Sequence, residues 1–494
     1  MLITALFSIP FIAALITVFV GKKYRVIEMV AMVAALVEAV LVFGLARPIQ
    51  ELFKINIQWP SISLYEIPGY FSFDALSVYI IALISTVIVF TTWYAIGYFR
   101  KEVEKDIIGF RRVRQFYVLF HLCVLAMFLA VSSLNPLIFW VALEATSLTS
   151  VFLVSFYNKP KSTEAAWKYL IINSLALLLA LLGTTLLTAA AGAHGAEGIV
   201  TWQSLIALAP NINPLVAKIA FVFILVGYGT KIGWVPLHTW KPDAYSKAPT
   251  PLVALMASAF LALAWYGMLR FILIGNAIGI GSFIQTSLLI FGVASVVVGA
   301  LIMLVQRNYK RFFAYSSIEH AGLLAIGFGL GNVFGIYASL LHLLYHTLAK
   351  PLAFFAAGNV FLRYGTTKLS HVRGLARVAP ITAGILVLAS VTLMGLPPFG
   401  IFASELTLLL AAFASHPFVG AVVLVFLVLS FIATLRMVAG LLTGEPSAEI
   451  EKGEPSKATL FPAIALGALL LVLSIWLPLW FPTLFQNIII AFSS

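Results

Sequence analysis

A lysine, a proline and a histidine interrupt a long apolar run near the middle of the chain. Lys231 ends a mostly apolar stretch that starts at residue 215, and Pro236 and His238 follow it. An ionisable residue inside a membrane helix costs about 2.5–3.5 kcal/mol on insertion scales, so its presence suggests a function. A helix broken by proline is tolerated at membrane depth only where protein or a water-filled cavity covers the freed backbone groups. A charge beside a helix break therefore predicts a transport site.

Three further ionisable residues follow one another at a spacing of four. His342, His346 and Lys350 share one face of a helix. At a rise of ~1.5 Å per residue, the series covers about 12 Å along the helix axis. Pro351 comes next and is expected to weaken the helix there. Histidine has an unperturbed pKa near 6.5, so this face is suited to passing protons.

Carboxylates occupy other apolar runs. Glu144 lies in one, Glu319 lies beside His320 in another, and Glu405 follows the break at 395–398 (Gly-Leu-Pro-Pro) by about two turns. A lysine in a medium of low dielectric loses its proton readily, and an opposite charge within about 4–6 Å restores it. These residue types therefore predict a relay in which carboxylates and lysines exchange protons through histidines.

Long apolar runs must position these groups. With 62% hydrophobic and 10% charged residues over 494 positions, the chain is not an ordinary soluble protein. A helix of about 20 residues crosses the ~30 Å hydrocarbon core of a bilayer. We therefore expect an all-α polytopic membrane protein with about fourteen transmembrane helices, at 2–20, 26–45, 74–98, 115–133, 135–157, 165–190, 214–237, 250–274, 282–305, 312–330, 332–361, 381–412, 417–440 and 459–483.

The loop cations predict the orientation in the membrane. The net charge of +12 is spread over the loops between apolar runs, so we expect no nucleic-acid partner. If the loops alternate between sides, nearly all loop cations, including Lys241 and Lys310, fall on one side, and only Arg47 and Lys54 fall on the other. Cytoplasmic loops carry such an excess, so both termini are expected to be extracytoplasmic. Residues 1–20 are predicted to form the first span rather than a cleaved signal peptide.

The sequence predicts no redox cofactor and no metal in this chain. Cys123 is the single cysteine, and one cysteine can hold neither an iron–sulfur cluster nor a disulfide. His342 and His346 lie one turn apart on one helix, which is a poor arrangement for clamping a haem between helices. We therefore expect electrons to react in partner subunits.

Two sets of five apolar runs follow the same plan. Each set has a proline-broken fourth run, a deep ionisable residue in its second run, and a lysine in its third, Lys168 or Lys350. Because five is odd, the second set must be inverted in the membrane relative to the first, a transporter design. The predicted divisions are 1–114 with three N-terminal helices, 115–275 and 282–441 with the two five-helix repeats, and 442–494 with a cytoplasmic loop and the last helix.

Four motifs carry a resemblance to a known family. They are VPLHTWKPDAYSKAPTP at 235–251, AYSSIEH at 314–320, HLLYHTLAKPLAFFAAGN at 342–359 and GLPPFGIFASE at 395–405. The chain resembles the antiporter-like subunits of respiratory complex I and of energy-converting membrane-bound nickel–iron hydrogenases, and it is most similar to the hydrogenase branch. The resemblance implies that Glu144 pairs with Lys231 and that Lys350 and Glu405 carry the proton onward. Secondary relay residues are then Lys168, His238, Glu319, His320, His342 and His346.

The chain departs from the family at the link between its two halves. Many relatives place a lysine or histidine in the eighth span, whereas residues 251–306 contain neither. The aligned stretch offers only the hydroxyls of Ser258 and Tyr266. We therefore expect the central link to consist of water and hydroxyls. No long lateral helix follows the last run, so the chain resembles a medial subunit.

The sequence thus predicts a proton-translocating subunit of an energy-converting redox complex in the plasma membrane of a prokaryote, with no catalysis by this chain alone. The resemblance implies a nickel–iron site and iron–sulfur clusters in partner subunits, a peripheral hydrogenase or dehydrogenase arm, and further membrane subunits. A sodium/proton antiporter subunit of the Mrp type and a medial subunit of a NADH/quinone complex I stay open as alternatives, as does sodium as the transported ion.

Overall fold

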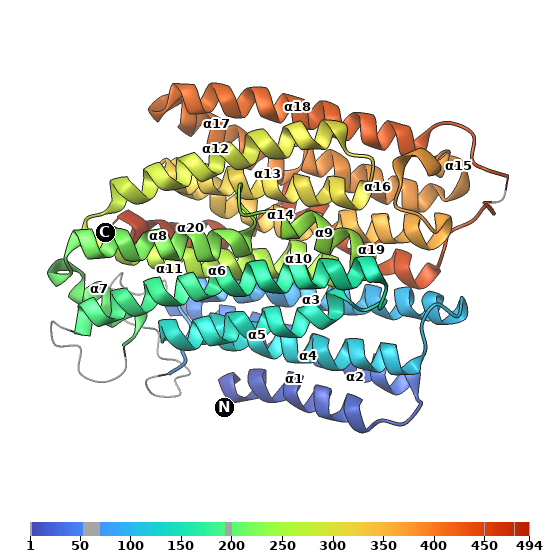
Figure 1. Cartoon of the computed structure of the whole chain (residues 1–494), viewed down its shortest axis with the longest axis horizontal. Coiled ribbons are helices and arrows are strands. Elements are labelled where there is room, and N and C mark those ends of the chain that lie inside the picture. Colours follow the sequence, from blue (N-terminus) through green and yellow to red (C-terminus); the bar gives the residue numbers. More distant parts are fainter. Residues whose placement is uncertain (1, 53–69, 193–199, 449, 479, 494) are drawn as a thin grey trace.

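The fold is a bundle of helices that run mostly along one direction (Figure 1). The computed structural model describes residues 2–52, 70–192, 200–448, 450–478 and 480–493; Lys54 lies outside them. Within these ranges, 11 helices are long and apolar enough to cross a membrane. Four shorter apolar helices add to them: Ile3–Phe19, Pro380–Leu393, Gly400–Ser415 and Trp480–Phe492. The prediction of an all-α polytopic membrane protein is confirmed.

The helices of the first half are α1 Leu2–Phe19, α2 Tyr24–Leu52, α3 Ala75–Glu104, α4 Phe110–Ser132, α5 Pro136–Val154, α6 Pro160–Gly192, α7 Trp202–Leu208, η1 Ala209–Asn211, α8 Pro214–Ile232, α9 Trp240–Lys247, α10 Thr250–Ala257 and α11 Ala259–Ile278. Those of the second half are α12 Gly281–Val305, α13 Tyr309–Gly329, α14 Val333–Tyr364, η2 Leu369–His371, α15 Leu375–Val378, α16 Pro380–Leu393, α17 Gly400–Ser415, α18 Pro417–Leu442, α19 Lys457–Ile475 and α20 Trp480–Ser493.

Side-chain caps and prolines fix where several spans begin. Asn135 precedes Pro136, and its Oδ1 accepts hydrogen bonds from the backbone N–H groups of Leu137 and Ile138. Asn213 caps α8 in the same way, again before a proline. Proline fits the first helical position because its missing N–H has no helical partner there. The Asn-Pro pairs in the sequence therefore mark the starts of α5 and α8.

Two breaks lie where glycine and proline predict them. α8 ends at Gly233, whose φ of 94° is left-handed, and residues 233–239 separate it from α9. α16 ends at Leu393, and α17 begins at Gly400 after Gly395, which has a φ of 64°. Glycine adopts this conformation without the steric penalty that a Cβ atom brings. Each break therefore contains a glycine in the left-handed conformation.

Three details differ from the sequence prediction. The run at 250–274 is not continuous, because Ser258 has non-helical angles (φ −124°, ψ −77°) between α10 and α11. The run at 459–483 is also divided: α19 ends at Ile475 and α20 begins at Trp480 after Pro478, which lacks a backbone donor. Pro351, in contrast, lies inside α14, which continues to Tyr364.

Close helix contacts place two spans at the centre. α14 and the α10–α11 segment are the two candidate spans whose apolar windows are fully buried in the described part of the chain, whereas α18 at one edge is mostly exposed (Figure 1). Gly227 of α8 lies against Ala176 and Ala180 of α6, and a Cβ there would come within 2.4 Å of the Ala180 side chain. Small residues allow membrane helices to approach this closely. The ionisable residues of α14 are therefore enclosed by protein.

Candidate functional site

Lys231 lies at the C-terminal end of α8 in a pocket of hydroxyls and aromatic rings. Its side chain is buried, and its Nζ donates hydrogen bonds to the Oγ of Ser147 at 2.6 Å and to the hydroxyl of Tyr169 at 3.3 Å. The Nζ also lies 5.6 Å and 5.5 Å from the ring centres of Tyr169 and Phe260, within cation–π range. Hydroxyl acceptors and the π faces of aromatic rings thus take the place of water around this ammonium.

Glu144 lies one turn before Ser147 on α5. Its Oε1 accepts a hydrogen bond from the Oγ of Ser174 at 2.6 Å, and its Oε2 has no hydrogen-bond partner among the described residues. No ion pair joins Glu144 to Lys231 within the described ranges, because the ammonium points to Ser147 instead. The direct pairing implied by the resemblance stays a prediction. In this structure each of the two groups hydrogen-bonds to a different serine, Glu144 to Ser174 and Lys231 to Ser147.

Lys350 is the centre of the second cluster. It is fully buried in α14, and its Nζ donates to the Oγ of Ser316 on α13 at 2.7 Å. Glu319 of α13 is close enough to interact electrostatically with Lys350. The Oε2 of Glu319 lies 3.7 Å from the Nε2 of His320. A carboxylate, a lysine and a histidine therefore meet between α13 and α14.

Three buried histidines extend this cluster. The Nδ1 of His320 and the Nε2 of His342 are 2.9 Å apart, and the Nδ1 of His342 is 3.0 Å from the Oγ of Ser404. His346 stacks near both rings, with centroid distances of 5.3 Å to His320 and 6.3 Å to His342. Neither ring nitrogen of His346 has a hydrogen-bond partner among the described residues. Imidazoles in such contact can pass a proton by changing tautomer.

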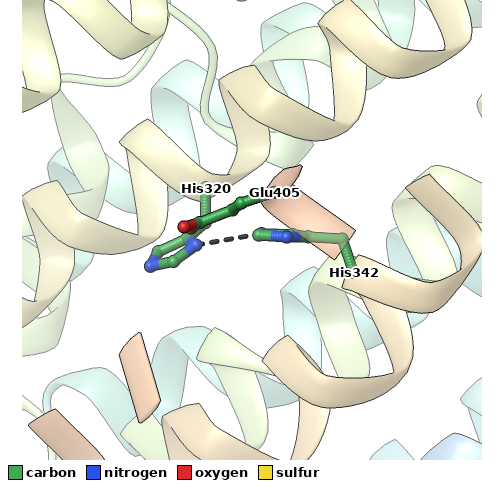
Figure 2. Close-up of side chains that lie close together, drawn as sticks. All are labelled: His320, His342 and Glu405. Carbon is green, nitrogen blue, oxygen red and sulfur yellow. Dashed lines mark hydrogen bonds between the residues drawn. The ribbon is translucent and has the colours of Figure 1, made fainter. Parts of the chain in front are cut away.

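Glu405 lies at the end of this chain of groups, on α17. A carboxylate oxygen of Glu405 and ring nitrogens of His320 and His342 all lie within 4.8 Å of one another (Figure 2). The approach depends on Gly395, because a Cβ there would lie 2.0 Å from Glu405 Oε2. Two histidines and a carboxylate could also hold a divalent cation such as Zn²⁺. Here the two histidines hydrogen-bond to each other, so the same atoms suit proton transfer.

Two of the predicted secondary residues lie apart from the buried clusters. Lys168 is exposed and forms ion pairs with Glu164, at 2.6 Å, and with Asp243, at 3.3 Å. His238 lies in the segment between α8 and α9, 6.0 Å from the ring centre of Tyr315. Neither residue forms a described hydrogen bond with the groups of α14.

Two buried lysines were assigned to loops by the sequence prediction, and that assignment is wrong. Lys241 is 1% exposed and donates to the carbonyl oxygen of Ile232 at 2.8 Å. Lys310 is 3% exposed and donates to the Oγ1 of Thr250 at 3.1 Å. The loop-charge rule counts cations between apolar runs and cannot detect that α9 folds back into the bundle. Three aromatic residues near Lys241, at 234, 240 and 245, were the available signal of burial.

The sequence matches a family model described as NADH:quinone oxidoreductase/Mrp antiporter, TM, over residues 133–433. This range contains every candidate relay residue from Glu144 to Glu405. The chain belongs to this family. It is therefore an antiporter-like, multi-pass membrane protein, as the four motifs indicate.

Two relatives show the similarity in sequence. The hydrogenase-4 component F homolog of Methylacidiphilum infernorum (isolate V4) is 33% identical over 414 residues, which cover 83% of this chain and 86% of the relative. The NADH-quinone oxidoreductase subunit N of Desulforudis audaxviator (strain MP104C) is 34% identical over 287 residues, which cover 58% of this chain and 56% of the relative.

Three solved structures have the same fold. A chain of the membrane-bound sulfane sulfur reductase, an archaeal respiratory membrane complex, superposes with a TM-score of 0.84 at 22% identity, over 99% of this chain and 96% of that chain. A chain of the Mrp complex from Dietzia sp. DQ12-45-1b gives 0.84 at 19%, over 100% and 96%. A chain of respiratory complex I from Thermus thermophilus gives 0.75 at 25%, over 98% and 99%. All three belong to membrane complexes of several subunits.

Proposed function

We propose that this chain is the proton-translocating subunit of an energy-converting redox complex of the membrane-bound hydrogenase type. The observation that carries the proposal is the buried cluster in which His320, His342 and Glu405 meet, with Lys350 buried about two turns along α14 from His342. A purely structural subunit has no need to bury several ionisable groups in contact, because each costs free energy to remove from water. The similarity to the hydrogenase-4 component F homolog supports the hydrogenase type.

Proton transfer follows from controlling the charge beside each lysine. An ammonium in low dielectric is held charged by a nearby carboxylate, and separating the two releases its proton. Glu144 would approach Lys231 in one state, and the structure would represent the other state, in which Ser147 holds the ammonium. For any such group, a change of one unit in its pKa corresponds to about 1.36 kcal/mol of free-energy difference between its charged and neutral forms. The first half of the chain thus delivers a proton when its partner subunits change this pairing.

The second half would accept and release the proton. Lys350, beside Glu319, receives it, and the three histidines connect it to Glu405. Glu405 then releases it through a half-channel on the extracytoplasmic side. The break between α16 and α17 opens the backbone near this carboxylate, as expected for a membrane site lined by non-helical chain.

The finer architecture belongs to the same proposal. Fourteen spans result if the pairs α10–α11 and α16–α17 each cross once, α8 is the seventh span with α9 as its broken end, and α19 is the last span, with α20 not counted as a crossing. The inverted repeats are then 115–275 and 282–441, flanked by the units 1–114 and 442–494. The cationic loops would face the cytoplasm, and both termini would be extracytoplasmic, in the plasma membrane of a prokaryote.

The redox chemistry would take place in other subunits. A nickel–iron site and iron–sulfur clusters are proposed for a peripheral hydrogenase arm, with further antiporter-like and small membrane subunits beside this chain. The three similar structures come from membrane complexes of several subunits and support a multi-subunit setting. A medial subunit of a NADH/quinone complex I is the second candidate, supported by the subunit N relative and by the complex I chain. A sodium/proton antiporter subunit of the Mrp type is the third.

One purification separates these candidates. An affinity tag on this chain should recover its complex from mild detergent, and mass spectrometry should identify hydrogenase large and small subunits. The complex should then pump protons into liposomes, reported by a trapped pH-sensitive dye, during hydrogen turnover. Co-purification of quinone-reactive dehydrogenase subunits would favour complex I, and recovery of antiporter subunits alone would favour the Mrp type. Sodium uptake without proton movement would contradict the proton assignment.

A further inference from the structure

The two halves of the relay lack an obvious carrier between them. Lys231 lies at the end of α8, and the histidine cluster lies on α13 and α14. The two hydroxyls that the sequence offers for the link are both engaged: the Oγ of Ser258 donates to the carbonyl oxygen of Ala254 at 2.5 Å. The hydroxyl of Tyr266 donates to the carbonyl oxygen of Val131 at 2.8 Å. The prediction that these hydroxyls form the central link is therefore not supported by their hydrogen bonds.

Lys241 lies where the missing carrier would be needed. The carbonyl oxygen that accepts its hydrogen bond belongs to Ile232, the residue after Lys231. On its other side, its charge acts on His346 and Lys350 of α14. Lys241 thus contacts the end of the first half and lies within electrostatic range of the second.

The break between α8 and α9 determines the surroundings of Lys241. A Cβ at Gly233 would lie 2.8 Å from the Cδ and 3.1 Å from the Nζ of Lys241, so only glycine leaves the lysine this path across the end of α8. Trp240, the residue before the lysine, donates its indole N–H to the carbonyl oxygen of Thr230 at 2.9 Å and thereby fixes α9 against α8. The fold therefore holds a flexible amine beside the interrupted helix.

The surroundings of Lys241 leave its charge uncompensated. No ion pair joins it to a carboxylate within the described ranges, and its Nζ lies 5.8 Å from the ring centre of Tyr245. No carboxylate of the described residues offsets the cost of burying this ammonium, so the amine gives up its proton readily, and a change of the charge nearby restores it.

We propose that Lys241 carries the proton between the two halves of the relay, from Lys231 by way of His346 to Lys350, and takes the place of a lysine or histidine in the eighth span. The Nζ of Lys241 would accept a proton as a neutral amine, leaving Lys231 neutral, and then pass it to an unprotonated ring nitrogen of His346. Both nitrogens of His346 lack another partner among the described residues. This inference rests on the proposed function.

Two variants test the carrier role against a structural role. Lys241→Arg keeps the charge and can still donate to Ile232, but a guanidinium does not release its proton at accessible pH. Lys241→Met keeps most of the side-chain length but removes the amine that would carry the proton. If Lys241 is a carrier, both variants should assemble while protons moved per electron pair fall by roughly tenfold or more, a loss typical of a missing general acid–base group. The measurement is proton uptake into liposomes that contain the intact complex.

Two matched controls accompany these variants. Lys247→Met removes a partly exposed lysine from the same helix, and its pumping should equal that of the unaltered complex. Lys350→Met tests the relay itself. Normal pumping by Lys241→Arg with loss in Lys241→Met would overturn the carrier role and leave Lys241 as a helix cap. Normal pumping in both, with loss in Lys350→Met, would also overturn it. Normal pumping in Lys350→Met would contradict the proposed function instead.

Discussion

The Nδ1 of His320 lies 2.9 Å from the Nε2 of His342, and this contact joins α13 to α14 in the buried centre of the second half. His342 in turn contacts Ser404, the neighbour of Glu405 in the sequence. The consecutive helices α13 and α14 and the more distant α17 therefore present one row of polar atoms. Because the row ends at a carboxylate beside a helix break, its direction suggests where protons leave the chain.

The first prediction concerns that carboxylate. Glu405→Gln keeps the size of the side chain and its hydrogen-bonding capacity but cannot release a proton. Assembly and electron transfer should be partly retained, while protons moved per turnover in liposomes should fall by roughly tenfold or more. The exposed acid Glu445 serves as the control, since Glu445→Gln should leave pumping unchanged. An unchanged stoichiometry in Glu405→Gln would make Glu405 structural.

The second prediction concerns the glycine that admits Glu405. At Gly395 a Cβ would lie 2.0 Å from Glu405 Oε2, and the φ of 64° disfavours any side chain. Gly395→Ala should therefore destabilise the chain by about 1–3 kcal/mol and displace the carboxylate. Gly384, inside α16, has no atom within 4 Å of a built Cβ, so Gly384→Ala should be neutral or stabilise by up to about 1 kcal/mol. Thermal unfolding of the two purified variants compares them directly.

Equal unfolding temperatures for these two alanine variants would show that the break can relax around a side chain. Pumping supplies a second measurement, because the displaced carboxylate should lower proton translocation in Gly395→Ala even at temperatures where the variant stays folded. Gly384→Ala should pump normally.

Much of the fold could be predicted from the sequence because hydrophobic length determines the spans and proline and glycine determine the breaks. The starts of α5 and α8 coincide with Asn-Pro pairs, and both expected breaks are present. The interruption at Ser258 could not be predicted, because no glycine or proline lies there to disfavour a helix.

The candidate site could be predicted only in part. The spacing of His342, His346 and Lys350 placed them on one helix without a structure, but the contact of His320 with His342 depends on how α13 packs against α14. Lys168 was expected in the relay because of its place in the repeat, yet the structure shows it exposed in ion pairs. Lys241 was treated as a loop cation because the reading of charges between apolar runs contains no information on burial.

The third prediction uses the ion pair between Asp74 and Arg270, whose closest atoms are 2.5 Å apart. Burial alone would raise the pKa of Asp74, but the charge of Arg270 and hydrogen bonds from Arg270 and Ser77 outweigh it and lower the pKa. An aspartate of this kind stabilises the folded state above its unfolded pKa of about 3.9, and the contribution is lost as the pH falls through the lower folded value.

In detergent, thermal stability of the chain should therefore fall on acidification below about pH 4, and less so in Asp74→Asn. At neutral pH, Asp74→Asn should cost roughly 3–5 kcal/mol, because it leaves the buried guanidinium of Arg270 without its counter-charge. Glu104→Gln, at the other end of α3 and exposed, should change stability by less than about 0.5 kcal/mol. If the thermal stability of Asp74→Asn and of the unaltered chain fell equally on acidification, Asp74 would not be the cause of the pH dependence.

The fourth prediction concerns redox activity. We expect the isolated chain to turn over neither hydrogen, quinone nor nicotinamide, because the proposed redox centres belong to partner subunits. The assay uses the purified chain in detergent, with the intact complex as the positive control. Turnover by the chain alone, at a rate that follows its concentration and resists further purification, would contradict the role of a pump module.

The last prediction concerns Lys231, whose ammonium donates hydrogen bonds to Ser147 and Tyr169. Variants at this position test whether Lys231 supplies only a positive charge or also transfers the proton. Lys231→Ala should cost roughly 1–3 kcal/mol, because it leaves these buried hydroxyls short of a partner, and it should abolish pumping. Glu144→Ala should cost less, since Glu144 is partly exposed and its side chain accepts one hydrogen bond, from Ser174, within the described part of the chain. Lys231→Arg should assemble, because it keeps the charge, but it should fail to pump because arginine does not release its proton. Proton uptake by liposomes with each variant in its intact complex gives the answer. A Lys231→Arg complex that pumps normally would mean that Lys231 supplies charge alone, and the proton would then have to reach Lys241 from Tyr169 or from Glu144 by another route.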